Sequence, residues 1–250
     1  MDLNLRGKSV IVTGGARNIG KAMVLGFLHE GARVVTTDLL DAATNQDFFE
    51  NIPKNLHSNV RILNFDISTD AGCKELCDFS MKEFGGLDIL VNSAAIHISQ
   101  TPEEITDEDF DKVLRNTLRS TLYMTRAAFS MMQKTKKGRI VNISSAVVYA
   151  GNPNELLYSC AKAGVEAATR AFARLGASNR ITVNAIAPHL IMTGMGLETL
   201  AKDPTIPTRI PLGRAGRVDE LVNLILYLSS EISEYITGQV IPFNGGRLMK

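Results

Sequence analysis

Ser9-Val10-Ile11-Val12-Thr13-Gly14-Gly15-Ala16-Arg17-Asn18-Ile19-Gly20 is the stretch that decides the expected fold. Its first four residues form a short β-branched run, which is typical of a buried strand, and the glycines that follow indicate a tight turn. Residues 19–30 then show helical spacing, so a strand, a turn and a helix follow one another. The N–H groups at the start of that helix would suit a pyrophosphate, although such a turn also serves simple chain reversal.

The same alternation continues to the C-terminus. Further expected strands cover 33–37, 60–65, 87–91, 138–143, 181–186 and 239–243. Expected helices cover 70–84, 107–133, a segment through Tyr158 to about 177, and 218–229. Residues 41–58 are polar and interrupted by Pro53, so we expect them to be irregular.

Apolar residues run continuously through the expected strands instead of alternating with polar ones. This pattern predicts a parallel sheet that is covered by helices on both faces. The chain contains no linker composition and no internal repeat. We therefore expect an α/β protein with one Rossmann-type catalytic domain over 1–250, a doubly wound seven-stranded parallel sheet, and a substrate lid at about 189–216.

Composition narrows the class of protein. The 250 residues are 45% hydrophobic and 21% charged, and their formal net charge is +1. Such a chain has a real core and no global field that would attract nucleic acid or an anionic membrane. Its three cysteines lack the spacing of a metal site, and no apolar run has the length of a bilayer span. We expect a cytoplasmic protein that acts on a small molecule without a bound metal.

Asp38 directly follows the second expected strand, where a carboxylate would accept hydrogen bonds from both ribose hydroxyls of an adenosine. It would also repel a 2′-phosphate, and this favours NAD over NADP. Arg17 acts in the opposite direction, because a guanidinium near that ribose could hold the phosphate. NAD is the expected cofactor, with NADP as the alternative, and a capping or loop role for Asp38 also stays open.

Tyr158 and Lys162 lie four residues apart on an expected helix and therefore share one face. A neighbouring ammonium favours the phenolate, so we expect Lys162 to lower the pKa of Tyr158 toward neutrality. Tyr158 would then be able to act as a general acid or base. The same spacing also occurs on ordinary solvated helices.

Several short motifs occur in a fixed order along the whole chain: Thr13-Gly14 with Ile19-Gly20, Asp66, Asn92-Ser93-Ala94, Asn116, Ser145, Tyr158 with Lys162, Asn184-Ala185-Ile186-Ala187-Pro188, Thr193, Pro211-Leu212-Gly213-Arg214 and Thr237-Gly238-Gln239. In these motifs the chain resembles the classical short-chain dehydrogenase/reductase family.

The resemblance implies a catalytic set of four residues. Tyr158 would exchange a proton with the substrate oxygen, and Lys162 would lower the pKa of that phenol and bind the nicotinamide ribose. Ser145 would hydrogen-bond the substrate oxygen, and Asn116 would hold a relay water. The family's usual separation of thirteen residues between serine and tyrosine selects Ser145 over Ser144.

The resemblance also implies a cofactor site and self-association. Among the departures from the family pattern are Asn18 at a usual glycine of the phosphate turn and His189 where glycine commonly follows the proline. We expect a homotetramer or homodimer, with the apolar helix 221–228 buried between subunits. The implied cofactor residues are Gly14, Arg17, Asn18, Ile19, Asp38, Asp66, Ile67, Asn92, Ala94, Tyr158, Lys162, Pro188, Ile191 and Thr193.

The sequence determines the identity of the substrate less well than that of the cofactor. A lid rich in Met and Leu favours an apolar secondary alcohol or ketone, unless those side chains pack on the protein itself. Polar residues in the expected pocket also keep a ring with several oxygens open. The candidate substrate residues are Ser145, His97, Val147, Asn152, His189 and Met195.

Three functions follow from these patterns. The first is an NAD-dependent oxidoreductase that transfers a hydride between the nicotinamide and a secondary alcohol or ketone. The second is an NADPH-dependent ketoreductase similar to the 3-oxoacyl-carrier-protein reductases, against which Asp38 argues. The third is a nucleotide-binding regulator without chemistry, against which the intact catalytic set argues.

Overall fold

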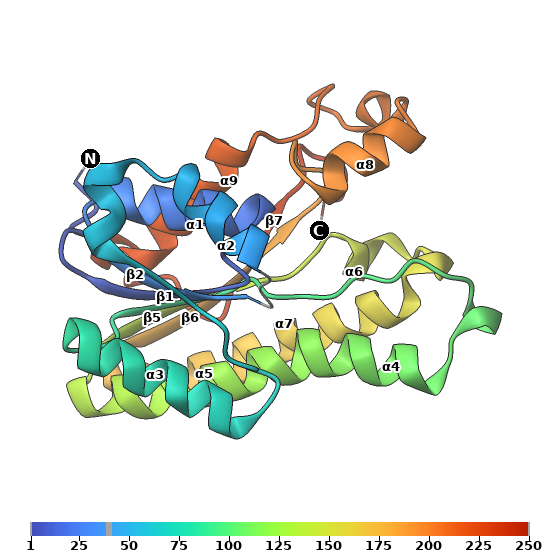
Figure 1. Ribbon diagram of the computed structural model, residues 1–250. Helices are drawn as coiled ribbons and strands as arrows, with labels where there is room; N and C mark the ends of the chain where they lie inside the picture. The colour runs from blue at the N-terminus through green and yellow to red at the C-terminus, as the bar shows by residue number, and fades with distance from the viewer. Residues whose placement is uncertain (1, 39–41, 250) are drawn as a thin grey trace.

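The computed structural model describes residues 2–38 and 42–249. Its seven strands form one sheet in the order β3-β2-β1-β4-β5-β6-β7, and every neighbouring pair is parallel (Figure 1). The predicted doubly wound sheet is therefore confirmed. The strands are β1 (Ser9–Thr13), β2 (Arg33–Thr37), β3 (Val60–Leu63), β4 (Ile89–Asn92), β5 (Gly138–Ile143), β6 (Ile181–Pro188) and β7 (Val240–Phe243).

Helices cover both faces of the sheet (Figure 1). On one face α1 (Asn18–His29), α2 (Ala42–Glu50) and α9 (Val218–Ser229) bury Phe27, Phe48 and Leu221 in a common apolar cluster. On the other face α3 (Asp70–Phe84), α5 (Ser120–Thr135) and α7 (Leu156–Gly176) bury Leu76, Met124 and Ala173 in a second cluster. Apolar burial on both faces stabilises the sheet between two helical layers.

The apolar side of α9 packs inside the chain. Leu221, Ile225 and Leu226 are buried against the core, and a Cβ on Gly26 of α1 would lie only 2.5 Å from Val222. The contact between α1 and α9 thus accounts for the apolar residues on this side of helix 221–228, and its burial between subunits stays a prediction.

The order of the strands reverses between β1 and β4. Thr13, the last residue of β1, stands in register with Asn92, the last residue of β4. The Thr13 hydroxyl oxygen accepts hydrogen bonds from the Ser93 and Ala94 N–H groups at 3.0 and 3.1 Å. Ligands bind at such a reversal in open parallel sheets, because the loops beyond the strand ends separate there.

The expected helix over 107–133 consists of three parts. It begins as α4 (Asp107–Val113), widens into the π-helical segment η3 (Leu114–Arg119) and continues as α5. A π-helical segment keeps the chain helical while it shifts the register of the side chains, so periodicity alone does not reveal it. Such segments frequently occur at functional sites, and this one carries Asn116.

The segment expected to be irregular contains α2 and a 3₁₀ turn η1 (Lys54–Asn59) after Pro53, while residue 41 lies outside the described residues. The expected lid contains α8 (Met195–Lys202) and η6 (Ile206–Arg209). The remaining short elements are η2 (Pro102–Glu104), α6 (Val147–Ala150), η4 (Pro153–Glu155), η5 (Ala177–Asn179) and η7 (Glu231–Ser233).

Among residues 2–38 and 42–249, no helix combines the length and the apolarity that crossing a membrane requires.

Candidate active site

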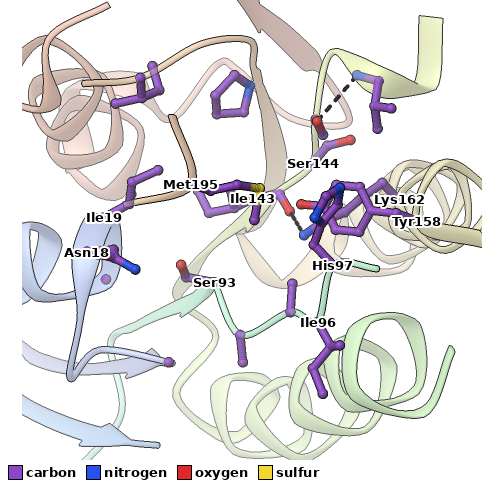
Figure 2. A pocket seen from close by; sticks show the side chains of 18 of the residues that line it. Asn18, Ile19, Ser93, Ile96, His97, Ile143, Ser144, Tyr158, Lys162 and Met195 are labelled. Carbon is purple, nitrogen blue, oxygen red and sulfur yellow. Dashed lines mark hydrogen bonds between the residues drawn. The ribbon is translucent and has the colours of Figure 1, made fainter. Parts of the chain in front are cut away.

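A cavity of about 710 Å³ opens beyond the carboxyl ends of the strands. Figure 2 shows Asn18 and Ile19 on one side of it and Tyr158 with Lys162 on another. The expected nucleotide side and the expected catalytic side thus face one cavity. The predicted residues in its wall are Gly14, Arg17, Asn18, Ile19, Asp38, Asp66, Ile67, Ala94, His97, Asn116, Ser145, Val147, Asn152, Tyr158, Lys162, Pro188, His189, Ile191, Thr193 and Met195.

The turn after β1 has the geometry of an anion-binding loop. Gly14 and Asn18 adopt positive φ angles of 68° and 50°, as expected for a glycine and for an asparagine that replaces one. A Cβ on Gly20 would lie 2.0 Å from the Gly14 carbonyl oxygen, so only glycine allows this approach. The side chain of the N-cap residue Arg17 makes no capping hydrogen bond, and the first turn of α1 contains no acidic residue. These N–H groups fit the pyrophosphate of a dinucleotide.

Asp38 lies beside this turn. One carboxylate oxygen accepts the Ala16 N–H at 3.2 Å, and the other is 3.3 Å from Arg17 Nη2. The Asp38 side chain is only 13% exposed, whereas that of Arg17 is 58% exposed. The carboxylate is therefore fixed at the cavity wall, while the guanidinium reaches it from the solvent side.

Asp66 belongs to a polar cluster at the end of β3. Its carboxylate accepts hydrogen bonds from the Ser68 N–H and hydroxyl at 2.9 and 2.5 Å, and from Arg115 at 3.1 Å. The Ser68 hydroxyl, supported by the Arg115 charge, lowers the pKa of Asp66 below its ordinary value. An ionised carboxylate is therefore held in the wall next to Ile67, where it could accept a hydrogen bond from an adenine amino group.

Asn92 does not line the cavity. Its side chain is buried below the cavity floor, where it donates to Thr125 Oγ1 at 2.9 Å and to Asn142 Oδ1 at 2.8 Å. The side-chain amide therefore ties β4 to α5 and β5, and a contact of the Asn92 backbone with the cofactor stays a prediction. Ala94, two residues further on, does reach the cavity.

Lys162 is 2% exposed and donates a 2.6 Å hydrogen bond from Nζ to the Ile143 carbonyl oxygen, as Figure 2 shows. Burial lowers the pKa of Lys162 to about 8. Its Nζ lies 5.5 Å from the centre of the Tyr158 ring, so the two side chains do share a face of α7.

The pKa of Tyr158 moves in the direction opposite to the expected one. Burial raises it above its ordinary value, and the carboxylate of Glu155 raises it further. The lowering by Lys162 that we expected is not found, since burial and the Glu155 carboxylate set the direction of the shift. The phenol is therefore held as a proton donor.

The two adjacent serines have different surroundings. The Ser144 hydroxyl donates to Glu166 at 2.8 Å in the core, and Tyr149 donates to the other oxygen of the same buried carboxylate. The Ser145 hydroxyl oxygen accepts the Val147 N–H at 3.3 Å and lies in the cavity wall. This geometry favours Ser145 as the group that faces a substrate and gives Ser144 a structural role.

Asn116 reaches the cavity from η3. Its side-chain NH₂ group donates to the Lys112 backbone carbonyl oxygen at 2.8 Å, and the Asn116 backbone carbonyl oxygen accepts the Ser120 hydroxyl at 2.7 Å. These bonds replace part of the regular helical ladder, and they hold Asn116 at the edge of the cavity.

On the substrate side, His97 packs edge-on against the Tyr158 ring, with 5.0 Å between ring centres and an interplanar angle of 88°. His97 Nε2 also bonds the Glu155 carboxylate. His189 presents a buried Nδ1 atom without a partner in the described part of the chain. Burial lowers the pKa of His189, as do Arg247 and Arg209, so the neutral imidazole is favoured at neutral pH.

Sequence reasoning missed two acidic residues of this region. Glu155 precedes Tyr158 by three residues, and that proximity was the available signal. Glu166 follows Lys162 by four residues and therefore lies on the same helical face, which could have indicated its burial. Among the described residues, no group of three or more His, Cys, Asp or Glu side chains could hold a metal ion.

Comparison with known proteins identifies relatives over the whole chain. Residues 14–247 match a family model described as enoyl-(acyl carrier protein) reductase. The chain is 36% identical to the 3-oxoacyl-acyl-carrier-protein reductase of Thermotoga maritima over 98% of its length and 99% of the relative's. It is 33% identical to the enzyme of the same name from Escherichia coli, over 99% and 100% of the two chains.

A solved structure shares this fold closely. A chain titled "putative gluconate dehydrogenase" from Agrobacterium tumefaciens superimposes with a TM-score of 0.92 at 29% sequence identity. The match covers 100% of the present chain and 99% of the other.

Proposed function

The chain belongs to the classical short-chain dehydrogenase/reductase family and is an NAD(P)-dependent oxidoreductase of CH–OH and keto groups, and on this premise we propose that Tyr158 is its general acid and base. The observation that carries the proposal is the convergence of Tyr158, Lys162 and Ser145 on the cavity that also contains the start of α1. A hydride site requires both parts to face the same space.

In the direction of reduction, Tyr158 donates its proton to the substrate oxygen, and the Ser145 hydroxyl donates a second hydrogen bond to it. Two donors directed at an oxygen that gains negative charge stabilise the transition state most effectively in a dry site. The bound nicotinamide supplies the hydride in this direction and accepts it in the other. Burial keeps the proton on the phenol before reaction, and the Lys162 ammonium beside the ring would favour the phenolate that the transfer leaves behind.

Lys162 is suited to return the proton. With a pKa of about 8 its ammonium group can lose and regain a proton near neutral pH, which a lysine with an ordinary pKa does not do. Asn116 lies in the same wall and would hold water that connects Lys162 to solvent. We propose that these residues resupply Tyr158 after each turnover.

We propose NAD as the preferred dinucleotide. The fixed carboxylate of Asp38 can accept both ribose hydroxyls, and an approaching 2′-phosphate would meet a like charge that is only 13% exposed. The alternative is NADPH, and the match to 3-oxoacyl-acyl-carrier-protein reductases favours the reductive alternative more than it favours an NAD-linked oxidation. Arg17 is the residue that would serve a 2′-phosphate.

Two substrate classes are supported by different observations. The names of the relatives favour a 3-oxoacyl thioester. The polar wall formed by His97, Glu155 and Asn152 favours a ketone that carries further oxygens, and the name of the structural neighbour agrees with this class.

The test is turnover by Tyr158→Phe. Removal of the hydroxyl should lower kcat by about 10²–10⁴-fold for every accepted ketone, while the rise in melting temperature caused by NADH or NADPH stays as in wild type. A Tyr158→Phe enzyme that keeps wild-type turnover would disprove the role of Tyr158. Melting with NAD and NADP in parallel shows which dinucleotide binds.

A further inference from the structure

The chain places an imidazole–carboxylate pair next to the proposed proton donor. His97 Nε2 bonds the Glu155 carboxylate. Figure 2 shows the His97 ring beside that of Tyr158, and the two rings are perpendicular with their centres 5.0 Å apart. Both members line the cavity, with side chains 21% and 18% exposed. The proposed mechanism uses neither of them.

Local packing explains why His97 points into the cavity. Ile96 and Ile98 on either side of it pack against the buried Leu157 and Val113 cluster. The chain there is anchored by the Ile96 N–H, which donates to Thr117 Oγ1 at 3.1 Å. Both isoleucines anchor this loop to the apolar cluster, and His97 between them reaches the cavity wall beside Ile96.

Glu155 is fixed from the opposite loop. It ends the 3₁₀ turn η4, and its N–H donates to the Asn152 carbonyl oxygen at 3.1 Å. The two loops are joined by a backbone bond of 3.0 Å from the Gln100 N–H to the Asn154 carbonyl oxygen. The backbone of both loops therefore holds His97 and Glu155 next to each other in the cavity wall.

The hydrogen-bonding states of His97 and Glu155 determine which groups of a substrate can bind to them. A carboxylate is only an acceptor, so His97 Nε2 carries a proton and donates to Glu155. His97 Nδ1 is then an acceptor in the neutral ring and a donor in the cation. A hydroxyl group satisfies both states, since it donates or accepts, whereas a carbonyl or thioester oxygen satisfies only the cation.

An apolar acyl chain would satisfy neither state. It would remove the remaining water from a partly buried charged pair without replacing its hydrogen bonds, which is unfavourable. A hydroxylated substrate replaces that water. Asn152 adds a side-chain amide in the same wall. Its oxygen already accepts the Asn154 N–H, so its NH₂ group can serve as a hydrogen-bond donor to a substrate.

We propose that His97 and Glu155 form a subsite for a hydroxyl group on the carbon next to the reacting one, so that the substrates are α-hydroxy ketones and the corresponding vicinal diols. This inference rests on the proposed function, because Tyr158 must hold the reacting oxygen for the neighbouring hydroxyl to reach His97. It implies that 3-oxoacyl thioesters are not the preferred substrates.

The experiment compares matched compounds that differ in one hydroxyl group. Wild type is assayed with 2-hydroxycyclohexanone against cyclohexanone, and with 1,2-cyclohexanediol against cyclohexanol, using both nicotinamide cofactors. The expected kcat/KM ratio in favour of the hydroxylated member is at least about tenfold, the size of one well-made hydrogen bond. His97→Phe keeps an aromatic edge beside Tyr158 and should bring the ratio close to one, and Glu155→Gln should lower it in part.

Glu103→Gln is the matched control, since Glu103 is exposed, lies in another 3₁₀ turn and is outside the cavity, and its ratio should equal that of wild type. A wild-type ratio near one overturns the proposal even if the variants do not fold. So does a kcat/KM with the N-acetylcysteamine thioester of acetoacetate above that with 2-hydroxycyclohexanone.

The proposed subsite and the proposed function are tested separately. Turnover that disappears in Tyr158→Phe but shows no hydroxyl preference leaves the proposed function standing and removes only the subsite. A wild-type enzyme that turns over none of these compounds with either cofactor overturns both.

Discussion

Replacement of Lys162 by methionine should abolish turnover and yet stabilise the cofactor-free protein at neutral pH. Burial lowers the pKa of Lys162 from 10.5 to about 8, a difference of about 2.5 pH units. At 1.36 kcal/mol per unit, burying the charged lysine costs about 3 kcal/mol at pH 7. Methionine has similar length and no charge, so Lys162→Met removes this cost.

Part of the gain is lost again. The hydrogen bond from Lys162 Nζ to the Ile143 carbonyl oxygen disappears, which costs about 1 kcal/mol. The expected net effect is a free energy of unfolding about 2 kcal/mol higher at pH 7. For a chain of this size that corresponds to a melting temperature about 4–8 °C higher.

The effect should depend on pH with a defined sign. Because the pKa of Lys162 is lower in the folded than in the unfolded state, the unfolded chain binds more protons between about pH 8 and pH 10.5. The stability of wild type therefore rises with pH through that window, as the buried lysine becomes neutral. The advantage of Lys162→Met should be largest near pH 7 and should shrink to nearly zero by about pH 9.5.

The measurement is urea unfolding of both proteins without cofactor at pH 7 and pH 9.5, together with the corresponding melts. Lys134→Met is the control, since Lys134 is exposed and its replacement should change stability by less than about 0.5 kcal/mol at either pH. A Lys162→Met protein less stable than wild type at pH 7, or an advantage that does not change with pH, would refute the reasoning.

Two further predictions concern the nucleotide end of the cavity. Asp38→Asn keeps an acceptor for the Ala16 N–H but removes the charge, so the ratio of the NADP to the NAD dissociation constant should fall about tenfold or more; an unchanged ratio in a binding titration would show that Asp38 does not select the dinucleotide. Gly20→Ala places a Cβ 2.0 Å from the Gly14 carbonyl oxygen, where only backbone movement relieves the clash, and should cost about 1–3 kcal/mol and weaken dinucleotide binding. The control Gly86→Ala meets no atom within 4 Å and should leave both unchanged in the same melts and titrations.

The nucleotide end of the fold could be predicted because its determinants are local. Gly14, Asn18 and Gly20 act through their own backbone angles and through the approach of one turn to one helix. Asp38 follows its strand directly, so its place at the sheet edge follows from the strand assignment. Signals of this kind occupy a few consecutive residues, and periodicity places them without knowledge of the tertiary contacts.

The substrate end could be predicted only in part, because its determinants are contacts between distant segments. Glu155 acquires a role only when its loop meets the loop of His97, 58 residues away. Asn92 has the residue type and the position of a ligand-binding residue, but Thr125 and Asn142 engage its amide from other elements. The sequence contained no sign of either partnership.

Helix α7 shows what the active site costs in stability, because it buries charged side chains. Tyr158, Lys162 and Glu166 are spaced four residues apart and occupy one face, and Lys162 and Glu166 are both at most 3% exposed. A helix that packs on a sheet ordinarily presents apolar side chains there. The cost is limited by specific partners, the Ile143 carbonyl group for Lys162 and the hydroxyls of Ser144 and Tyr149 for Glu166.

All three partners lie close to Ser145 in the chain: Ile143 ends β5, and Ser144 and Tyr149 stand in the segment after it, on either side of Ser145. Satisfying the buried charges of α7 therefore also fixes the backbone that carries the second substrate donor. The fold gives up apolar burial at Lys162 and Glu166. In return, the phenol, the ammonium and the serine hydroxyl are held relative to one another before any substrate arrives. Preorganisation of this kind is what lowers the barrier to proton transfer in a dry site.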